Sequence, residues 1–414
     1  MAQITKTMKL LINPDNYQIA ELEQVTKRYT EACDFVSQYA FEHRLPFRYM
    51  ELHKQLYRIV RTEFGLKAQM AISVFKTVCA RYNTVQEQLS NKPFRYKDED
   101  GTWKSIPRTI DWLWKPISFR RPQADFVRNR DYAFVVDRKT GKHLISINTL
   151  NDRVRVSYHV PKCFEQYFDG TWSFGTGKVV SLKGKWYIHI PMTKEISDEF
   201  DVENAKHIVG IDRGLRFLAT TYDEKGKTSF IDGKKIMEKR NKFQQVRSEL
   251  QARGTKSAKR VLKRISGREN RWMSDVNHQI SKTLVDRYGS NTLFVVEDLT
   301  NVSFDESNLS DRSKQGRKDV RSWAFYQFEQ DLIYKARAMG SDVLKVSAAY
   351  TSQRCPKCGR ILKDNRNHTK HEYHCDCCGY RSNDDRVGAM NIQLLGTLFV
   401  SGDQNPRFGP RKVK

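Results

Sequence analysis

Hydrophobic residues recur at helical spacing along the first quarter of the chain. Residues 5–12 alternate between apolar and polar side chains, which predicts a short strand, and the turn sequence NPD directly follows them. Apolar residues then recur every three or four positions in three stretches between residues 19 and 85. We therefore expect a small helical unit over residues 16–90.

The pattern changes near Pro93 from helical spacing to short alternating segments. Between about residues 103 and 195, aromatic and β-branched residues alternate with polar ones in segments that turns separate. The clearest segments are DYAFVVD, HLISIN, RVRVSYHV, KVVSL and KWYIHIPM. Strands at this spacing predict a small barrel or sandwich. The strand at residues 5–12 is able to join it, in which case the helical unit is an insertion within the β domain.

Strands and helices are expected to alternate after the acidic segment SDEFDVEN. HIVGID and LATTYD predict adjoining strands, and LFVVE and LKVS predict two more. The expected helices cover residues 233–288, 322–339 and 385–397. The polar residues 302–320 are expected to be mobile, and the residues after Ser401 are expected to form a disordered tail.

The charge of the chain indicates a polyanionic partner. The 414 residues include 73 Lys and Arg against 48 Asp and Glu, so that the net charge is +25, and the basic residues are spread along the whole sequence. Nucleic acid is the simplest partner for such a charge. A surface that is charged only for solubility usually carries a much smaller excess. An anionic membrane surface is a weaker alternative, because no cationic amphipathic helix stands apart.

Two further features limit the class of protein. No apolar run approaches the roughly 20 residues of a membrane-spanning helix, and the N-terminus lacks a secretory signal, so we expect a cytoplasmic, nucleoid-associated protein without a membrane partner. The hydrophobic content of 39% is enough for two or three domains with cores of their own. Cys33, Cys79 and Cys163 lie in apolar surroundings and are expected to be buried thiols.

The other five of the eight cysteines gather within residues 355–378. Two CxxC pairs separated by sixteen residues are typical of a structural zinc ribbon with four thiolates. The expected ligands are Cys355, Cys358, Cys375 and Cys378. The sequence CDCC leaves Cys377 as a spare, and His371 or His374 could replace one thiolate, although a place in a solvated loop is favoured for both.

Three carboxylates stand at the ends of predicted elements. Asp212 ends an otherwise apolar strand, Glu297 ends a second one, and Asp385 directly precedes a helix. Buried carboxylates are costly unless they are paired or coordinated, and oxygen ligands suit Mg²⁺ or Mn²⁺. Two such ions about 4 Å apart are the usual arrangement for hydrolysing phosphodiester bonds. The order Ile-Asp-x-Gly before Leu-Ala-Thr is similar to the hairpin that opens RNase H-like nuclease domains.

Together these motifs resemble the TnpB family of transposon-encoded RNA-guided nucleases and their relatives, the miniature type V CRISPR effectors. The resemblance spans almost the whole chain, including its start, KLLINPDNYQIAELEQVTKRYTEACDFVSQYAFE. The other motifs that carry it are GIDRG (210–214), VVEDLTN (295–301), SWAFYQFEQDLIYKA (322–336), TSQRCPKCG (351–359) and CDCCGY…DDRVGAMNI (375–392).

The resemblance implies an α+β multidomain fold. Its parts are a wedge β-barrel with an inserted helical recognition unit, an RNase H-like (RuvC) α/β nuclease domain and a zinc-ribbon insertion. The implied boundaries are 1–15 and 96–200 for the wedge barrel, 16–95 for the helical recognition domain, 205–350 and 382–400 for the RuvC domain, 351–381 for the zinc-ribbon target-nucleic-acid-binding domain, and 401–414 for the disordered tail.

The same resemblance implies the activity and its requirements. A structured guide RNA pairs with one strand of double-stranded DNA, the protein recognises a short flanking motif, and Mg²⁺ (or Mn²⁺) at Asp212, Glu297 and Asp385 supports cleavage. Asp385 is preferred to Asp384 because it lies six residues before Asn391, which is the family's spacing. Asp384 could instead be a ligand or cap the helix. Two departures from the family pattern are Val387, where Asn is usual, and Arg386 directly after the acid.

Basic residues supply the expected nucleic-acid contacts. Residues 234–271 hold fourteen Lys and Arg against three acids, and a second group interleaves with Trp112, Trp114 and Phe119. Half of these aromatic residues are expected to belong to the barrel core. The candidate contacts are Arg120, Arg121, Arg128, Arg130, Lys239, Arg240, Lys259, Arg260, Lys263 and Arg264.

Two other functional classes stay open at this stage. One is an RNA-guided DNA-binding repressor that does not cut, and the other is a guide-independent RuvC-type nuclease or transposase. Retention of all three acids favours the active nuclease. The sequence leaves open whether the protein acts as a monomer or a homodimer, and whether it belongs to a transposon or a CRISPR locus.

Overall fold

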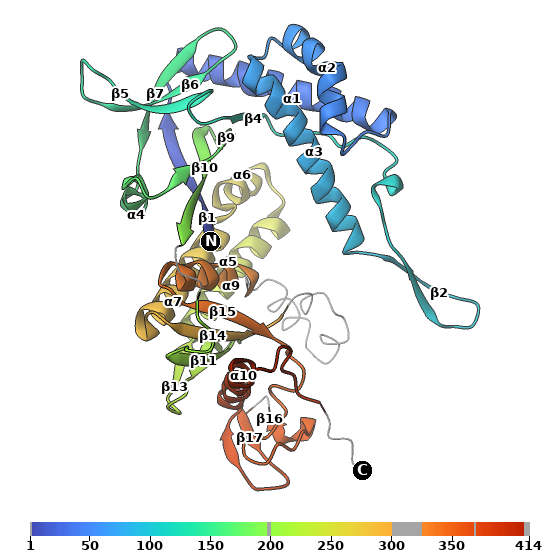
Figure 1. The fold of residues 1–414 in the computed structure, drawn as a ribbon, viewed down its shortest axis with the longest axis vertical. Coiled ribbons are helices and arrows are strands. Elements are labelled where there is room, and N and C mark those ends of the chain that lie inside the picture. Colours follow the sequence, from blue (N-terminus) through green and yellow to red (C-terminus); the bar gives the residue numbers. More distant parts are fainter. Residues whose placement is uncertain (1, 197–199, 300–324, 368–369, 410–414) are drawn as a thin grey trace. The chain divides into compact units, whose positions relative to one another are not determined.

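The structure is a computed structural model that describes residues 2–196, 200–299, 325–367 and 370–409. The stretch 302–320, which was expected to be mobile, lies outside these residues. The chain divides into two compact units (Figure 1), one formed by residues 5–194 and one formed by residues 2–4 together with the residues from Glu195 on. Each unit has hydrophobic cores of its own.

The alternating segments of the first unit form an eight-stranded β-sheet. Its strands follow the order β4-β9-β10-β1-β7-β6-β5, and β8 pairs with β10. The first strand along the chain therefore lies in the middle of the sheet, between strands from the other end of the unit. The strands are β1 (Ala2–Asn13), β4 (Gln123–Phe126), β5 (Tyr132–Val136), β6 (His143–Asn148), β7 (Arg153–His159), β8 (Ser173–Phe174), β9 (Gly177–Leu182) and β10 (Lys185–Ile196).

Three helices stand in the sequence between β1 and β4, as the hydrophobic spacing predicted. They are α1 (Asn16–Glu42), α2 (Tyr49–Glu63) and α3 (Ala68–Ser90). Asp15 and Gln18 form a capping box at the start of α1, which explains why the helix begins directly after the turn. A hairpin of β2 (Phe94–Lys97) and β3 (Trp103–Ile106) follows the helices.

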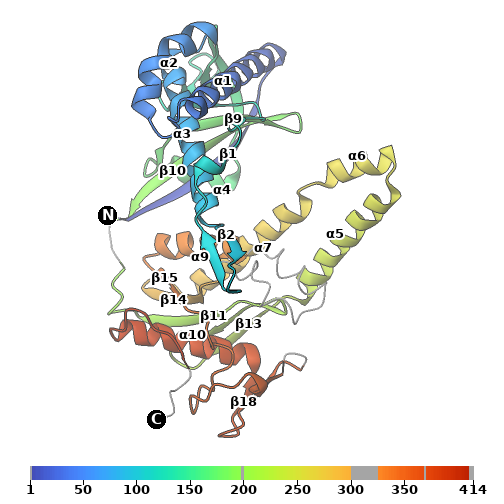
Figure 2. The ribbon, with the colours of Figure 1, turned by 90° about the vertical axis from the view of Figure 1, so that its right-hand side faces the viewer.

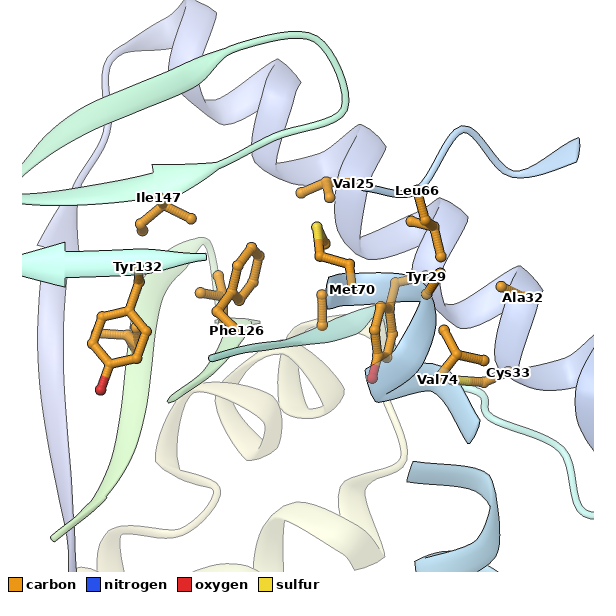
Figure 3. Packing of buried hydrophobic residues seen from close by; sticks show 14 of the residues in the cluster. Val25, Tyr29, Ala32, Cys33, Leu66, Met70, Val74, Phe126, Tyr132 and Ile147 are labelled. Atoms are coloured by element: carbon orange, nitrogen blue, oxygen red, sulfur yellow. The ribbon is translucent and has the colours of Figure 1, made fainter. Parts of the chain in front are cut away.

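Helices and barrel share one hydrophobic core. Figure 3 shows Tyr29 of α1 and Met70 of α3 beside Phe126 of β4, and all three side chains are fully buried. The helical insertion is therefore packed onto the barrel and is not tethered to it only by its ends. Cys33 and Cys79 belong to this core as expected, whereas Cys163, at the short helix α4 (Lys162–Glu165), is exposed, which corrects the expectation of a buried thiol.

The second unit contains a five-stranded sheet in the order β13-β12-β11-β14-β15. The hairpin strands on one side are antiparallel to β11, whereas β11, β14 and β15 run parallel to one another. All six residues of β14 are buried, as expected for a central strand that is covered on both faces. The strands are β11 (His207–Asp212), β12 (Phe217–Tyr222), β13 (Thr228–Asp232), β14 (Thr292–Glu297) and β15 (Asp342–Val346).

Different helices cover the two faces of this sheet. Phe294 and Val296 share a core with residues of α7 (Arg268–Tyr288) and α9 (Phe325–Ala338) on one face. Leu293 and Val295 share a core with residues of α10 (Asp384–Val400) on the other. Because neighbouring residues of a strand point to opposite faces, residues 293, 295 and 297 all face α10.

The long basic helical region is broken into three helices. α5 (Lys234–Arg253) ends at Gly254 and α7 begins after Gly267, and both glycines have positive φ angles, of 62° and 76°. Such angles suit glycine and interrupt a helix. The middle helix is α6 (Lys256–Ile265), and Figure 2 shows α5 and α6 extending away from the sheet.

A small three-stranded sheet stands between β15 and α10. It consists of β16 (Arg366–Asn367), β17 (Glu372–His374) and β18 (Arg381–Asn383). The first cysteine pair precedes β16, and the second lies between β17 and β18. Val387 of α10 packs in the same small core as Cys355 and Tyr373. Val387, which departs from the family pattern, thus joins the ribbon to the helix by an apolar contact.

The residues after α10 do not form a tail that is disordered from Ser401. Phe408 packs against the core between the sheet and α10, the guanidinium of Arg354 lies 4.6 Å from the centre of its ring, and Pro406 is buried. The expectation of a disordered tail is therefore corrected up to Gly409, because an aromatic side chain anchors this segment. Among the helices that the structure describes, none has the length and apolar character needed to cross a membrane.

Glycines allow β11 and α10 to approach closely. A Cβ atom on Gly210 would lie 2.2 Å from the carbonyl oxygen of Ala389, and one on Gly396 would lie 2.4 Å from a methyl group of Val295. Backbone atoms cannot move aside as a flexible side chain can, so Gly210 is required for this packing.

We expect Gly210→Ala to destabilise the second unit by about 1–3 kcal/mol, the usual cost of overpacking a core. Urea unfolding followed by circular dichroism measures this change. Gly409→Ala is the matched control, because no atom lies within 4 Å of a Cβ there. Equal stability of the two variants would contradict the assigned contact.

Candidate active site and zinc cluster

Asp212 and Glu297 come together because their strands are adjacent and parallel. Ile211 pairs with Val296 in the register of β11 and β14, so the next pair along the two strands is Asp212 and Glu297. Gly210 and Leu293 both face α10, and the alternation of side chains places the two acids on that same face. Both carboxyl groups therefore stand at one edge of the sheet, below the start of α10.

Asp385 joins them from the first turn of α10. Gly388, one turn further on, allows the helix to approach, since a Cβ atom there would lie 2.7 Å from Oδ2 of Asp212. Asp212, Glu297 and Asp385 are each 8% exposed. The structure thus collects three nearly buried carboxyl groups from three elements that are far apart in the sequence.

The electrostatics of the site reflect this crowding. Burial raises the pKa of Asp212 well above its ordinary value, and the negative charges of Glu297 and Asp385 raise it further. Burial also raises the pKa of Glu297 and that of Asp385. The site therefore favours a cation that would offset the repulsion among these carboxylates.

The donor set fits hard divalent cations. Carboxylate oxygens are the ligands that Mg²⁺ and Mn²⁺ prefer, and the pKa of Asp212 stays raised although Arg366 lowers it. Among the described residues, a group whose ligand atoms all lie within 4.8 Å of one another is formed by His371, Asp384 and Asp385, and it does not include Asp212 or Glu297. The three acids thus surround a shared site without forming one compact set of ligands.

Arg213 is a residue that the sequence analysis missed. Its side chain is 1% exposed, and its Nη2 donates a hydrogen bond to the backbone carbonyl of Glu297. Nη1 lies 3.4 Å from Oε2 of Glu329 on α9, whose other oxygen lies 3.3 Å from Nζ of Lys345. A buried cation directly after Asp212 therefore joins the ends of β11 and β14 to α9. The motif GIDRG contains this residue, but its burial could not be read from the motif.

The ribbon contributes a second cation to the site. Nε of Arg366 donates a hydrogen bond of 2.9 Å to Asp384, and Nη2 lies 3.5 Å from Asp385. Nδ1 of His371 lies 3.4 Å from Asp384 and 3.9 Å from Asp385. His371 thus lies in the turn between β16 and β17, near the acids of α10, and is not part of the cysteine cluster. No spacing in the sequence connects Arg366 or His371 with the acids.

The structure distinguishes the two adjacent acids of α10. Asn383 is the N-cap, because its side chain accepts a hydrogen bond from the backbone N–H of Arg386, so Asp384 does not cap the helix. Asp384 is fully buried and paired with Arg366. Asp385 raises the pKa of Asp212 more strongly than Asp384 does.

Arg386 points away from the acids. Its guanidinium donates hydrogen bonds to Thr228, Tyr380 and Ser382. It lies 5.7 Å from the centre of the Tyr222 ring. The residue that departs from the family pattern here is therefore directed to β13 and the ribbon, away from Asp385.

The four expected zinc ligands form one cluster. Sγ of Cys355 lies 3.6 Å from that of Cys378, and Sγ of Cys358 lies 3.5 Å from that of Cys375. Zinc–sulfur bonds of about 2.3 Å place sulfurs about 3.8 Å apart at the corners of a tetrahedron, so the cluster has the size for a zinc ion. Cys377 is exposed and lies outside the cluster.

The chemistry of the thiols agrees with this fit. The backbone N–H of Arg360 faces the sulfur of Cys358 and is the main reason why the pKa of that thiol is lowered to about 7. Burial raises the pKa of Cys355 to about 12. A bound cation would favour the thiolate form at both positions.

The basic residues of the second unit fall into two groups. Lys239, Lys259, Arg260, Lys263 and Arg264 are exposed on α5 and α6. Lys239 lies 4.7 Å from the centre of the Trp272 ring. Arg240 is 1% exposed and pairs with Glu269 at 3.4 Å, so the expectation that it contacts nucleic acid is corrected. It faces inward because it packs α5 against α7.

The basic residues of the first unit are also divided. Arg120 and Arg121 are exposed and line a cavity of about 990 Å³ together with Trp114, which is 81% exposed. Arg128 lies 4.9 Å from the centre of the Phe134 ring, within the aromatic residues of the barrel. The remaining residue, Arg130, is exposed and donates to Gln69.

Two of the three aromatic residues named with these arginines are not part of the core. Trp112 is 47% exposed and Trp114 is 81% exposed, whereas Phe119 packs against the core of the first unit. The exposed indoles thus remain available for stacking.

Comparisons with protein families match two parts of the chain. The model described as "Cas12f1-like, TNB domain" matches residues 325–392, which include the ribbon. The model described as "Probable transposase" (OrfB_IS605) matches residues 189–303. Together the two matches include all three acids, since the transposase model covers Asp212 and Glu297 and the TNB model covers Asp385.

Three curated relatives are 25% to 29% identical to this chain over the aligned residues. A Cas12f1 endodeoxyribonuclease of Syntrophomonas palmitatica is 25% identical over 56% of this chain and 48% of its own length. One of Sulfoacidibacillus thermotolerans is 29% identical over 56% of this chain and 55% of its own. A TnpB-like protein of Methanocaldococcus jannaschii is 29% identical over 57% and 83%. The chain spans about half the length of the first two relatives.

A solved structure shares the fold. The protein of a Cas12f1–sgRNA–target DNA complex superposes with a TM-score of 0.57 at 12% identity, covering 94% of this chain and 99% of that one. The expected fold class is therefore confirmed: a β-barrel with a helical insertion, an RNase H-like α/β domain and a zinc-ribbon insertion.

The cysteine cluster gives a direct prediction. We expect the purified protein to hold about one zinc ion per chain, and Cys378→Ser to lose it, because a closed site needs all four thiolates. Elemental analysis by mass spectrometry measures the metal. Cys377→Ser is the matched control and should keep its zinc, since Cys377 lies outside the cluster. Loss of zinc from the control alone would contradict the assigned ligand set.

Proposed function

Since this chain belongs to the TnpB family and is related to the miniature type V CRISPR effectors, we propose that it is an RNA-guided DNA endonuclease. The observation that carries the proposal is the convergence of Asp212, Glu297 and Asp385 at one edge of an RNase H-like sheet. Three nearly buried carboxyl groups in a chain of net charge +25 suit an enzyme that brings a polyanion to bound cations.

The carboxylates would hold Mg²⁺ or Mn²⁺. When bound, such ions supply a nucleophilic water at neutral pH and stabilise the charge of the leaving oxygen of a phosphodiester. Two-ion sites divide their ligands between the ions, so Asp212, Glu297 and Asp385 need not form one compact set. Arg213 keeps the ends of β11 and β14 together, and Arg366 orients the start of α10 through Asp384 and Asp385.

The exposed basic residues would bind the nucleic acids. We assign Lys239, Lys259, Arg260, Lys263 and Arg264, which lie on helices that extend from the sheet, to the backbone of the guide RNA or of its duplex with DNA. Arg120, Arg121 and Arg130, with Trp114 nearby, would add phosphate contacts and stacking in the first unit. The protein itself would read only a short motif beside the target.

The domain assignment follows the same proposal. The wedge barrel would comprise residues 1–15 and 96–200, and the helical recognition domain residues 16–95. The RuvC domain would comprise residues 205–350 and 382–400, with the zinc-ribbon domain at 351–381 between its parts. We propose that the protein acts on DNA at the nucleoid, as a monomer or a homodimer.

The proposal is tested with the protein expressed from its native locus. We expect a discrete RNA to copurify, and this complex to cleave a matching DNA library with randomised flanks when Mg²⁺ is present. Sequencing the RNA and the cleaved DNA gives the guide and the flanking motif. RNA-dependent binding without any cleavage would instead indicate a repressor. Cleavage without RNA would indicate a guide-independent nuclease or transposase, and would overturn the proposal.

The carboxylates predict a separation of binding from cleavage. Asp212→Asn should lower the cleavage rate by about 10³-fold or more, because one ligand oxygen loses its charge, while RNA-guided DNA binding stays within about twofold. Gel-shift and single-turnover assays measure the two quantities. Asp275→Asn is the control, since Asp275 is exposed on α7 and accepts a hydrogen bond from Gln279. Cleavage by Asp212→Asn at the wild-type rate would contradict the role of Asp212 as a metal ligand.

A further inference from the structure

Thr351 directly contacts one of the proposed metal ligands. It stands five residues after the end of β15, and it is 1% exposed. Its hydroxyl group donates a hydrogen bond to Oε1 of Glu297 and also lies 3.0 Å from the carbonyl oxygen of Ala348.

The side chain of Glu297 depends on this contact for its orientation. Arg213 holds only the backbone carbonyl of Glu297. A carboxylate with a free χ3 torsion can turn its oxygens away from a cation. The hydroxyl of Thr351 fixes one of these oxygens, as outer-shell hydrogen bonds do for metal-binding carboxylates.

Asn391 in turn holds Thr351. Its amide nitrogen donates hydrogen bonds of 2.7 Å to the carbonyl oxygens of Thr351 and of Arg354, and its oxygen accepts one from Arg354 at 3.2 Å. Asn391 is fully buried on α10, the helix that also carries Asp385. One amide group therefore fixes the four-residue segment from Thr351 to Arg354 against that helix.

The same segment runs directly into the zinc cluster. Cys355 follows Arg354, and its backbone N–H donates a hydrogen bond to the carbonyl oxygen of Arg360 across the turn that holds the first cysteine pair. Because Cys355 is buried and shares a cluster with Cys358, Cys375 and Cys378, a bound ion would fix the end of the segment. The hydrogen bonds thus form a continuous path from the first cysteine pair through Asn391 and Thr351 to Glu297.

We propose that Thr351 and Asn391 are positioning residues that couple the zinc cluster to Glu297, so that the zinc-loaded ribbon increases the affinity of the carboxylates for Mg²⁺. The inference rests on the proposed function only for the identity of the reaction. The coupling itself is a property of two cation sites in one chain, and it is measurable without cleavage. By linkage, Mg²⁺ must stabilise bound zinc by the same factor.

The first test uses one substitution and its rescue. Thr351→Val keeps the shape of the side chain and removes the hydroxyl, whereas Thr351→Ser keeps the hydroxyl. We expect Thr351→Val to weaken Mn²⁺ binding, measured by calorimetry on the zinc-loaded full chain, by about 10-fold, and Thr351→Ser to restore it to within about threefold. The Mg²⁺ concentration for half-maximal cleavage should shift by the same factor, with unchanged DNA binding.

Thr283→Val is the matched control. Thr283 is exposed on α7 and donates its hydroxyl to the carbonyl oxygen of Gln279, so the same substitution is made at an exposed position of a helix. Its Mn²⁺ affinity should equal that of the wild type. Equal affinities for wild type and Thr351→Val would overturn the proposal, as would failure of Thr351→Ser to restore binding.

The second test needs no substitution and covers the case in which Thr351→Val does not fold. The wild-type chain is treated with a zinc-binding dye, and the equilibrium release of zinc is measured with and without millimolar Mg²⁺. We expect Mg²⁺ to reduce zinc release by about 5-fold or more. Zinc release that does not depend on Mg²⁺ would overturn the coupling.

The two tests separate this inference from the proposed function. If the wild type binds Mn²⁺ but never cleaves DNA, the endonuclease proposal fails while the coupling can still hold. If the wild type cleaves DNA and Thr351→Val matches it in both Mn²⁺ affinity and Mg²⁺ dependence, the coupling fails while the endonuclease stands.

Discussion

The repulsion among three nearly buried carboxyl groups is the constraint on which the second unit depends. Burial raises the pKa of Asp212, Glu297 and Asp385, and the negative charges of Glu297 and Asp385 raise the pKa of Asp212 further. Arg213 places a buried positive charge behind the two strand ends, and Arg366 brings another from the ribbon. The two arginines thus hold the acids near one another, and the carboxylate oxygens remain the ligands that a metal ion would use.

The packing of α10 makes this arrangement possible. Gly210 and Gly388 let the backbone of the helix lie against β11, so that Asp385 reaches the edge where Asp212 ends its strand. The same helix carries Val387 into the core of the ribbon and Asn391 against the segment before Cys355. One helix therefore positions an acid, supports the ribbon and connects the two, which explains why its buried face mixes small, apolar and amide side chains.

The ribbon is more than an attachment to the five-stranded sheet and its helices. Arg366 and His371 contact the acids of α10, while Thr351, next to the first cysteine pair, contacts Glu297. Thr351 precedes the first cysteine pair, whereas Arg366 and His371 stand between the two pairs. A structural ion there would stiffen both connections at once, because it closes the loop of chain between them.

The sequence by itself determined most of the helices and strands, and it identified the cysteines and acids of the two candidate sites. Alternation and helical spacing located the strands and helices, because side-chain period follows backbone geometry, and the CxxC pairs and the strand-end acids pointed to residues that the structure gathers in two clusters. Only the tertiary structure decided which charges are buried. Arg240 faces inward and Lys239 outward, and Arg213, Arg366 and Thr351 meet the acids, because burial and long-range contact depend on how distant elements pack and leave no local pattern.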